Sequence, residues 1–278
     1  MKNIIAILSV AVLLFAACDK INPNEYTTTT GGGGSSNWEN FNVQRALVEK
    51  YTGPKCPNCP NADVTLDAAH AQYGDRLIVI SVNHPTGQGE PFANQPDLRT
   101  DDGTAWDTWL GINSIPSAYL NRDRSRQYTG SMSDIVAAIG DVVERYPLCG
   151  IGVTATATDD SIAIDVDIEF FSTIEGATTL TLALTEDALV YKQSMPDGSR
   201  QDDYVHNHML RDVITATFGD DVPLQGVAGE HKVGHYSYHI PDTDPAIVLS
   251  NCHIVAFLSY RDSRKIINSA ECIIQNKQ

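Results

Sequence analysis

The sequence predicts an α/β domain followed by an all-β domain with an antiparallel sandwich fold. In the first half, a strand pattern, a helix pattern and a second strand pattern follow one another. The second of these strands, 77–82, is a continuous apolar run, as in strands covered on both faces. After Pro147 the pattern changes to short strands without helical periodicity. A chain of 278 residues, 42% of them hydrophobic, can bury the cores of two such domains.

The N-terminus has the pattern of an export signal. Lys2 precedes an apolar run over 4–17 that is short for a bilayer span and ends in small residues. Its last residues, Leu-Phe-Ala-Ala before Cys18, resemble a bacterial lipobox, in which the cysteine is acylated, for example with palmitate. We expect a signal peptide over 1–17 and a lipid anchor on Cys18. The alternative is an ordinary signal peptide in which Cys18 has no role.

A tether and an acidic charge balance follow from composition. Residues 18–37 contain four consecutive threonines and four consecutive glycines, which is typical of a flexible coil. Acidic residues outnumber basic ones 35 to 19, a formal net charge of -16. Because binding to nucleic acid requires clustered Lys and Arg, we expect no nucleic-acid partner.

The α/β domain is expected over 38–147. Residues 45–51 have a strand pattern, and 60–73 place Ala62, Leu66, Ala69 and Tyr73 on one helical face. After the strand 77–82, a long connection over 84–102 is expected to form a wall beside the cysteine pair, with His84 and Phe92 as contacts. The alternative is a surface loop without a functional role. Further elements are a short helix over 104–110 with Trp106 and Trp109 in the core, paired strands over 117–121 and 126–128, and a closing helix over 133–146.

A dithiol motif, Cys56-Pro57-Asn58-Cys59, lies between the first strand and the first helix. Backbone N–H groups and the helix dipole favour a thiolate at a helix N-terminus, and Lys55 adds positive charge. We therefore expect Cys56 to be the exposed attacking nucleophile and Cys59 the resolving thiol. The alternatives are an inert structural disulfide or half of a zinc site, which would need two further ligands.

The residues around this motif resemble the thioredoxin fold. Ala46-Leu47-Val48-Glu49-Lys50-Tyr51 precedes the dithiol, and Gly111-Ile112-Asn113-Ser114-Ile115-Pro116-Ser117 and Gln127-Tyr128-Thr129-Gly130 follow it. The resemblance implies that Pro116 is cis and faces the dithiol, and that Pro116 presents backbone groups to a partner chain. Lys55, Pro57, Ile115 and His84 are then expected substrate contacts.

Three departures from that fold's pattern limit what carries over. Lys55 replaces the tryptophan that usually precedes the first cysteine. Glu49 lies seven residues before Cys56, whereas the buried acid of thioredoxins lies six before. Proton transfer by Glu49 is therefore not inferred. The ending Asn58-Cys59-Pro60 also differs from the Gly-Pro dipeptide of strong reductants, so no redox direction is inferred.

A narrower resemblance is to the outer-membrane lipoproteins of the Omp28 family. It rests on Tyr-Thr-Gly-x-x-Cys-x-Asn-Cys-Pro, Asp97-Leu98-Arg99-Thr100 with Gly103, and Tyr119-Leu120-Asn121-Arg122. It implies a thioredoxin-like domain joined to a β-rich region in the cell envelope. Asp19 is an inner-membrane retention signal in some bacteria, so the inner membrane is the alternative location.

The expected function is thiol-disulfide exchange with exported proteins or another envelope redox protein, without a cofactor. Such a chain would be a thiol-disulfide oxidoreductase. The alternative is a non-catalytic binding or structural lipoprotein whose Cys56–Cys59 pair only stabilises the fold. Neither reading needs a metal.

The β-rich domain is expected over 148–278. Strands are predicted over 151–158, 162–171, 178–186, 204–215, 231–240, 251–260 and 265–274. A hairpin formed by the last two strands would bring Cys252 and Cys272 opposite each other or one step out of register, which predicts a structural disulfide and leaves Cys149 free. Pairing of Cys149 with either cysteine is the alternative.

Histidines also recur in this region. His206 and His208 are expected on one strand face, and His231, His235 and His239 on another. Since Tyr236, Tyr238 and Ile240 are the natural inward residues of their strand, the histidines beside them should point outward, and no metal site is expected.

Overall fold

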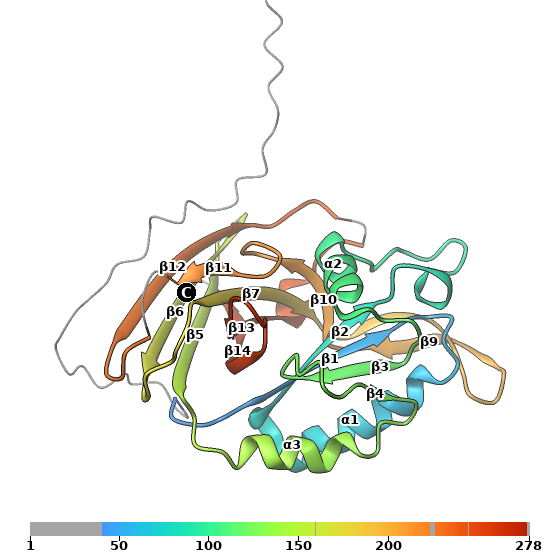
Figure 1. Ribbon diagram of the computed structural model, residues 1–278. Helices are drawn as coiled ribbons and strands as arrows, with labels where there is room; N and C mark the ends of the chain where they lie inside the picture. Colours follow the sequence, from blue (N-terminus) through green and yellow to red (C-terminus); the bar gives the residue numbers. More distant parts are fainter. Residues whose placement is uncertain (1–40, 159, 223–225, 244, 277–278) are drawn as a thin grey trace, which may run out of the picture.

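The computed structural model describes residues 41–158, 160–222, 226–243 and 245–276. The predicted signal peptide, tether and lipidation site at Cys18 lie outside these residues. The described strands form a 12-stranded sheet in the order β12-β6-β5-β14-β13-β7-β10-β2-β1-β3-β4, with β11 paired to β7, and a separate two-stranded sheet of β8 and β9 (Figure 1).

The α/β part is built on four strands: β1 (Ala46–Thr52), β2 (Leu77–Asn83), β3 (Ser117–Leu120) and β4 (Tyr128–Thr129). β1 pairs in parallel with β2 and antiparallel with β3, which pairs antiparallel with β4. The helices are α1 (Cys59–Tyr73), α2 (Asp101–Leu110) and α3 (Ile135–Val143). Short 3-10 turns lie at Gly74–Arg76 and Gly87–Gly89. Each predicted element of this part is present.

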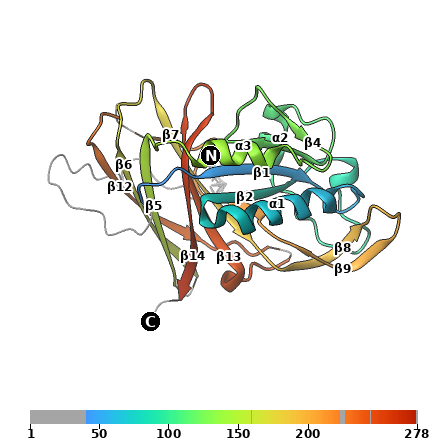
Figure 2. The same cartoon turned by 90° about the horizontal axis from the view of Figure 1, so that it is seen from below.

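The helices cover both faces of these strands. α1 and α3 lie together on one face (Figure 2), where Val48 and Val79 pack against Leu66 and Ile139. α2 covers the other face, and its Trp106 is fully buried. The predicted core role of Trp106 is thus confirmed, whereas Trp109 is only partly buried and packs edge-to-face against Phe218.

The remaining strands come from the C-terminal half. They are β5 (Cys149–Ala157), β6 (Ser161–Phe170), β7 (Thr178–Glu186), β8 (Leu189–Ser194), β9 (Arg200–His206), β10 (Met209–Val213), β11 (Asp220–Val222), β12 (His231–His239), β13 (Cys252–Tyr260) and β14 (Ile266–Asn276). A 3-10 turn at Leu249–Asn251 precedes β13. The strand expected over 204–215 is two strands, since the chain turns between them at His208, whose φ is 58°.

This part is strand-rich as predicted, but it is not a separate antiparallel sandwich. β14 pairs antiparallel with β13 along most of its length and then in parallel with β5 through Ile274–Asn276. Because β14 has 11 residues, it can pair with a different strand at each end. The resulting curved sheet encloses one apolar core, which includes Ile164 of β6, Leu182 of β7 and Ile254 of β13.

The sheet also continues across the expected boundary at residue 147. β10 pairs in parallel with β2 at Met209 and Ser81, and the Ser81 N–H donates a 2.7 Å hydrogen bond to the oxygen of His208. Val255 and Phe257 of β13 join the core beneath α2. The two predicted parts therefore share a sheet and a core.

Candidate functional site: a covered disulfide

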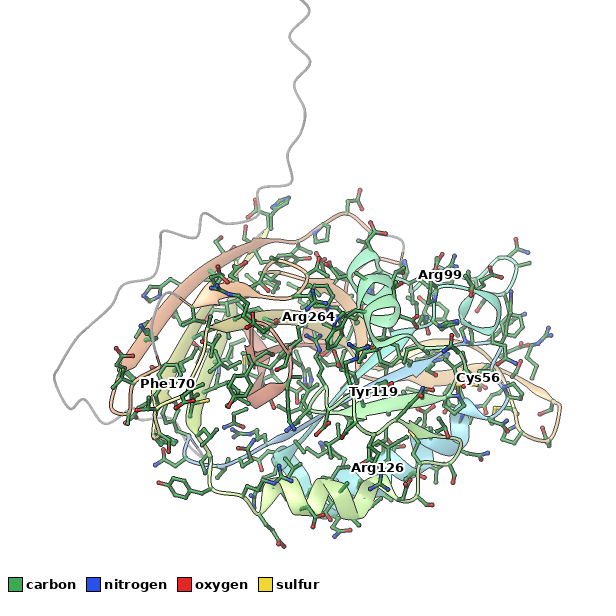
Figure 3. All side chains as sticks on the ribbon, viewed as in Figure 1. Cys56, Arg99, Tyr119, Arg126, Phe170 and Arg264 are labelled. Carbon is green, nitrogen blue, oxygen red and sulfur yellow. A yellow bond between two sulfur atoms is a disulfide. The ribbon has the colours of Figure 1, made fainter. Side chains whose placement is uncertain are left out.

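The loop between β1 and α1 holds Cys56 and Cys59 together. The Cys56 N–H bonds to the oxygen of Gly53 and the Cys59 N–H to the oxygen of Cys56, at 3.1 and 3.3 Å. α1 begins at Cys59 after Asn58 as N-cap, with Pro60 in its first turn, where the missing N–H costs nothing. The two cysteines form a disulfide with a Cα–Cα distance of 5.5 Å. Figure 3 shows Cys56 near one end of the molecule.

Pro116 lies beside this loop. Ser117 at the start of β3 pairs with Tyr51 of β1, so Pro116 comes next to Thr52, the last residue before the loop. The Ile115–Pro116 peptide bond is cis, as the sequence resemblance implied. Ile115, Lys55 and Pro57 are partly exposed around the disulfide. Lys55 forms an ion pair of 3.7 Å with Glu90, so its charge is partly balanced.

Both cysteines are covered, each with only 1% of its surface exposed. The side-chain amide of Gln193 in β8 donates hydrogen bonds to the backbone oxygens of Cys56 and Gly53, at 2.8 and 3.3 Å. The Ser194 N–H donates to the oxygen of Pro54 at 2.8 Å. The expectation that Cys56 is exposed is therefore wrong, because a hairpin more than 130 residues further along the chain lies over it.

The long connection over 84–102 forms the other side of this cover, as predicted. The Lys55 N–H donates to the oxygen of Gln88 at 3.0 Å. A Cβ at residue 53 would lie 2.4 Å from that same oxygen, so the close approach requires glycine there. His84 points to α2 instead, where its Nδ1 lies 2.7 Å from Asp107 Oδ2. Phe92 lies under the guanidinium of Arg200 in the hairpin, at 4.4 Å.

A buried ion pair lies on the α1 face of β1. Lys50, six residues before Cys56, pairs with Asp63 of α1, which also accepts a 2.7 Å hydrogen bond from Tyr204 Oη of β9. Burial raises the pKa of Asp63, but Lys50 and Tyr204 outweigh this effect and leave that pKa lowered. Asp63 lies four residues after Cys59, which places both side chains on one helical face. Sequence reasoning missed this pair, although both spacings are visible in the sequence.

Glu49 points to the opposite face of β1, where Arg122 balances its charge. Its carboxylate accepts two hydrogen bonds from Arg122 Nε, both 2.9 Å, and one of 2.7 Å from an Arg122 terminal amino group. The Arg122 guanidinium in turn lies 4.5 Å from the ring centre of Trp106. With 0% and 1% side-chain exposure, this pair is part of the core, and both carboxylate oxygens of Glu49 are bound by Arg122.

The predicted disulfide between Cys252 and Cys272 is not present. Both are free, as is Cys149. Cys272 lies opposite Ile254, two residues along β13 from Cys252, so the two cysteines are diagonal neighbours instead of a directly opposed pair. Burial raises the pKa of the Cys149 thiol to about 12. The pKa of the Cys252 thiol is also raised to about 12, and burial is the largest of the causes.

The histidines of β12 point outward, each beside an acid. His231 lies 2.5 Å from Asp167 and His235 lies 2.6 Å from Asp165, while Tyr236 is buried. His206 ends β9 and His208 lies in the following turn, so these two do not share a strand face. Among the described residues, no three His, Cys, Asp or Glu side chains are grouped so as to hold a metal ion.

Fold and site together define an α/β unit with a covered disulfide at a helix N-terminus, continued by strand-rich structure. The family model for the outer membrane protein Omp28 matches residues 104–278. The chain belongs to this family and is located at the outer membrane of the cell envelope. In the part of the chain that the structure describes, no helix combines the length and apolar character needed to span a bilayer.

Solved structures show what the fold is similar to. HBP35 of Porphyromonas gingivalis is 15% identical, with a TM-score of 0.67 over 84% of this chain and 76% of that one. A domain of the outer membrane lipoprotein Omp28 from the same organism is 18% identical over 48% of this chain and 93% of its own, with a TM-score of 0.36. Curated protein sequences contain no match to this chain.

Proposed function

We propose that this chain is a lipid-anchored outer-membrane protein with a thioredoxin-like part that exchanges thiols with exported proteins or another envelope redox protein. The observation that carries the proposal is the Cys56–Cys59 disulfide at the N-terminus of α1. Unpaired N–H groups at a helix N-terminus stabilise a thiolate, which is both the attacking and the leaving group in exchange. Pro116 beside Thr52 completes the arrangement expected from the sequence resemblance.

Starting from the oxidised pair, exchange runs in two steps. A partner thiolate attacks Sγ of Cys56, forming a mixed disulfide, and Cys59 leaves as a thiolate. A second partner thiolate then attacks the partner sulfur of that bond and releases Cys56 as a thiolate. The partner loses two electrons and gains a disulfide, the pair gains two electrons, and each released thiolate takes a proton from solvent. The reverse reaction uses the same steps.

Access requires displacement of the β8–β9 hairpin, since both sulfurs are covered. The hairpin is a sheet of its own, and Val190 and Val205 on it are 52% and 49% exposed. A two-stranded hairpin that pairs with no strand of the main sheet is expected to open at a lower free energy than the main sheet itself. Lys55, Pro57 and Ile115 would then meet the partner. His84, held by Asp107, would shape the loop wall.

The Cys59→Ser variant of the full chain tests the exchange. Cys56 should then accumulate a mixed disulfide with an envelope protein, visible as a slower band on a non-reducing gel that dithiothreitol removes. Cys56→Ser should give no such band, and Cys149→Ser should behave as the parent chain. If Cys59→Ser traps nothing and the purified chain fails to reduce insulin, exchange is excluded.

Burial of the disulfide favours a second candidate function: a non-catalytic binding or structural lipoprotein in which the pair only closes the loop. In that case mild reductant should leave Cys56 and Cys59 oxidised in the native chain, and loss of both should lower the melting temperature without any effect on envelope thiols. The rate of reduction under native conditions distinguishes the two candidates.

The lipid anchor is tested separately. Metabolic labelling with a palmitate analogue should mark the parent chain and not Cys18→Ala, and separation of the two membranes should recover the parent chain with the outer one. Labelling that persists in Cys18→Ala would exclude this cysteine as the anchor.

A further inference from the structure

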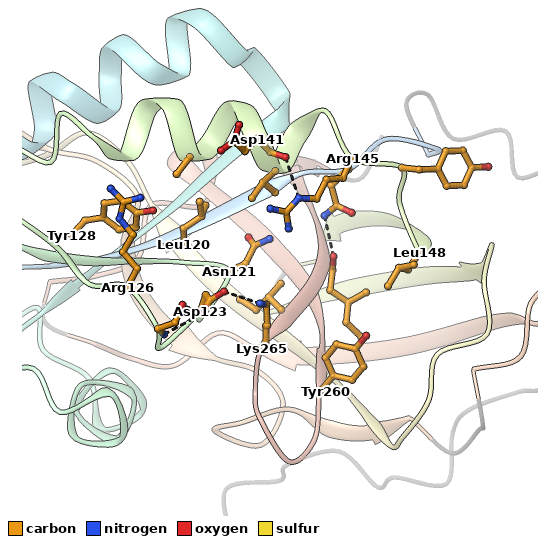
Figure 4. A pocket seen from close by; sticks show the side chains of 17 residues that line it. Leu120, Asn121, Asp123, Arg126, Tyr128, Asp141, Arg145, Leu148, Tyr260 and Lys265 are labelled. Carbon is orange, nitrogen blue, oxygen red and sulfur yellow. Dashed lines mark hydrogen bonds and ion pairs between the residues drawn. The ribbon is translucent and has the colours of Figure 1, made fainter.

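A cavity of about 440 Å³ lies at the other end of β1 from the disulfide. Gln44, two residues before β1, lines it, whereas the disulfide loop follows Thr52 at the far end. A seven-residue strand separates the two places by about 20 Å. Figure 4 shows the cavity between α3 and the β13–β14 hairpin, at the seam between the two parts of the chain. Ligand sites favour such seams, and their volumes are typically about 300–1,000 Å³.

The cavity wall combines apolar side chains with polar and charged ones. Its apolar lining includes Leu120 of β3, Val142 of α3, and Ile266 and Ile267 of β14. The rings of three tyrosines, Tyr128, Tyr146 and Tyr260, stand around it. Tyr146 is 80% exposed and Leu148 beside it 38%, which leaves an apolar rim open to solvent. The aromatic ring or aliphatic chain of a ligand would displace water from these apolar side chains, which favours binding.

Within the described part of the chain, one cation on the cavity wall lacks an acidic partner. Lys265 pairs with Asp123 at 2.7 Å and Arg126 with Asp134 at 2.5 Å. Arg145 instead donates from Nε to the backbone oxygen of Asp141 at 3.1 Å, and among the described residues no carboxylate pairs with its terminal amino groups. In a chain with a net charge of -16, an arginine held by a backbone oxygen at a cavity wall is available to an external anion.

The neighbouring acids limit the charge of that anion. Asp123 and Asp141 also line the cavity, so a doubly charged phosphate would be repelled more than a single carboxylate. A carboxylate also fits the planar fork of one guanidinium through two parallel hydrogen bonds. Asn121 adds a donor, because its Oδ1 accepts from the Leu47 N–H at 2.7 Å while its Nδ2 has no partner among the described residues.

We propose that this cavity binds a small aromatic carboxylic acid, with the ring among Leu120, Val142 and Ile266 and the carboxylate on Arg145. The site is independent of thiol exchange, since no residue of the disulfide loop lines it. Loss of either activity would leave the other intact.

Isothermal titration calorimetry of the full chain with indole-3-acetate tests the site, with indole-3-acetamide as the neutral probe of nearly the same shape. The acid should bind at least tenfold more tightly than the amide. Arg145→Gln should weaken binding of the acid at least tenfold and leave the amide within about twofold. Ala138→Phe, a change at a partly exposed wall position, should abolish binding of both by filling the cavity.

Arg200→Gln is the matched control, because Arg200 stacks on Phe92 beside the disulfide, away from the cavity. This variant should bind the acid as the parent chain does. Circular dichroism melting of each variant verifies folding. The proposal is overturned if indole-3-acetate gives no binding heat at millimolar concentration, if acid and amide bind equally, or if folded Arg145→Gln or Ala138→Phe binds the acid unchanged.

Discussion

The side-chain amide of Gln193 donates a 2.8 Å hydrogen bond to the backbone oxygen of Cys56, across 137 residues of sequence. Gln193 is 2% exposed, and the same amide group also reaches the oxygen of Gly53. Buried amide groups without a partner are costly, so the hairpin and the disulfide loop satisfy one another. Access to the sulfurs is therefore controlled by the strand-rich part of the chain.

Replacing Gln193 with alanine should make the disulfide more reactive. The two hydrogen bonds to the loop that the closed state loses are worth about 1 kcal/mol each, or about 2 kcal/mol together, so opening of the hairpin should become about thirtyfold more frequent. The rate at which tris(2-carboxyethyl)phosphine reduces the native chain, followed by maleimide labelling and mass shift, should rise by that factor. Gln201→Ala, at an exposed position of β9 in the same hairpin, is the control and should react as the parent chain. Equal rates for all three chains would mean that the hairpin does not limit access.

The Glu49–Arg122 pair should be among the most sensitive positions in the fold. Glu49→Ala leaves the Arg122 guanidinium buried without its carboxylate, although Trp106 still faces it. Breaking a buried pair in this way costs about 3–5 kcal/mol of unfolding free energy. Asp123→Asn breaks an ion pair whose two side chains are 47% and 41% exposed and should cost less than about 1 kcal/mol. Urea unfolding of both variants measures the difference, and equal losses would contradict the assigned role.

The elements of the α/β part could be predicted because their signals are local. The apolar run 77–82 and the helical face of Leu66 and Ala69 each determine an element without reference to distant residues. Cys56 and Cys59 are close in sequence, and Pro116 was placed by resemblance to a known fold. These residues are where the sequence predicts them.

What could not be predicted depends on pairings between distant residues. The hairpin strand β9 has the polar sequence Arg-Gln-Asp-Asp-Tyr-Val-His, with no apolar face to mark it. Its cover over Cys56 and the pairing of Tyr204 with Asp63 follow only from the folded chain. Cys252 and Cys272 were assigned to the correct hairpin, but the register is offset by two residues, which sequence patterning does not determine.

The three cysteines of the C-terminal half should carry free thiols in the native protein. Alkylation in denaturant without reductant, followed by peptide mapping, should label Cys149, Cys252 and Cys272 and leave only Cys56 and Cys59 joined. Without denaturant, maleimide should label Cys149 far more slowly than in denaturant, because Cys149 is fully buried and burial raises the pKa of its thiol to about 12. A peptide pair joining Cys252 and Cys272 would contradict the register of β13 and β14.

Mild acid should loosen the cover of the disulfide through His206. Burial, together with the charge of Lys50, lowers the pKa of this histidine to about 4, and its Nε2 is buried with no hydrogen-bond partner in the described ranges of the chain. In the unfolded chain the pKa is about 6.5, so between these two values the unfolded state binds the extra proton. The stability from neutral His206 is complete above pH 6.5 and falls as the pH decreases towards 4.

Urea unfolding at pH 7 and pH 5.5 measures this effect. The unfolding free energy of the parent chain should fall by about 1 kcal/mol from His206 alone, and the loss should be smaller by that amount in His206→Gln. His235→Gln is the control, since His235 is 57% exposed beside Asp165 on β12. The rate of reduction of the Cys56–Cys59 disulfide, divided by that of an exposed reference disulfide, should also be higher at pH 5.5 than at pH 7. An identical pH dependence in the parent chain and His206→Gln would show that His206 is not held in its neutral form by burial within the folded chain.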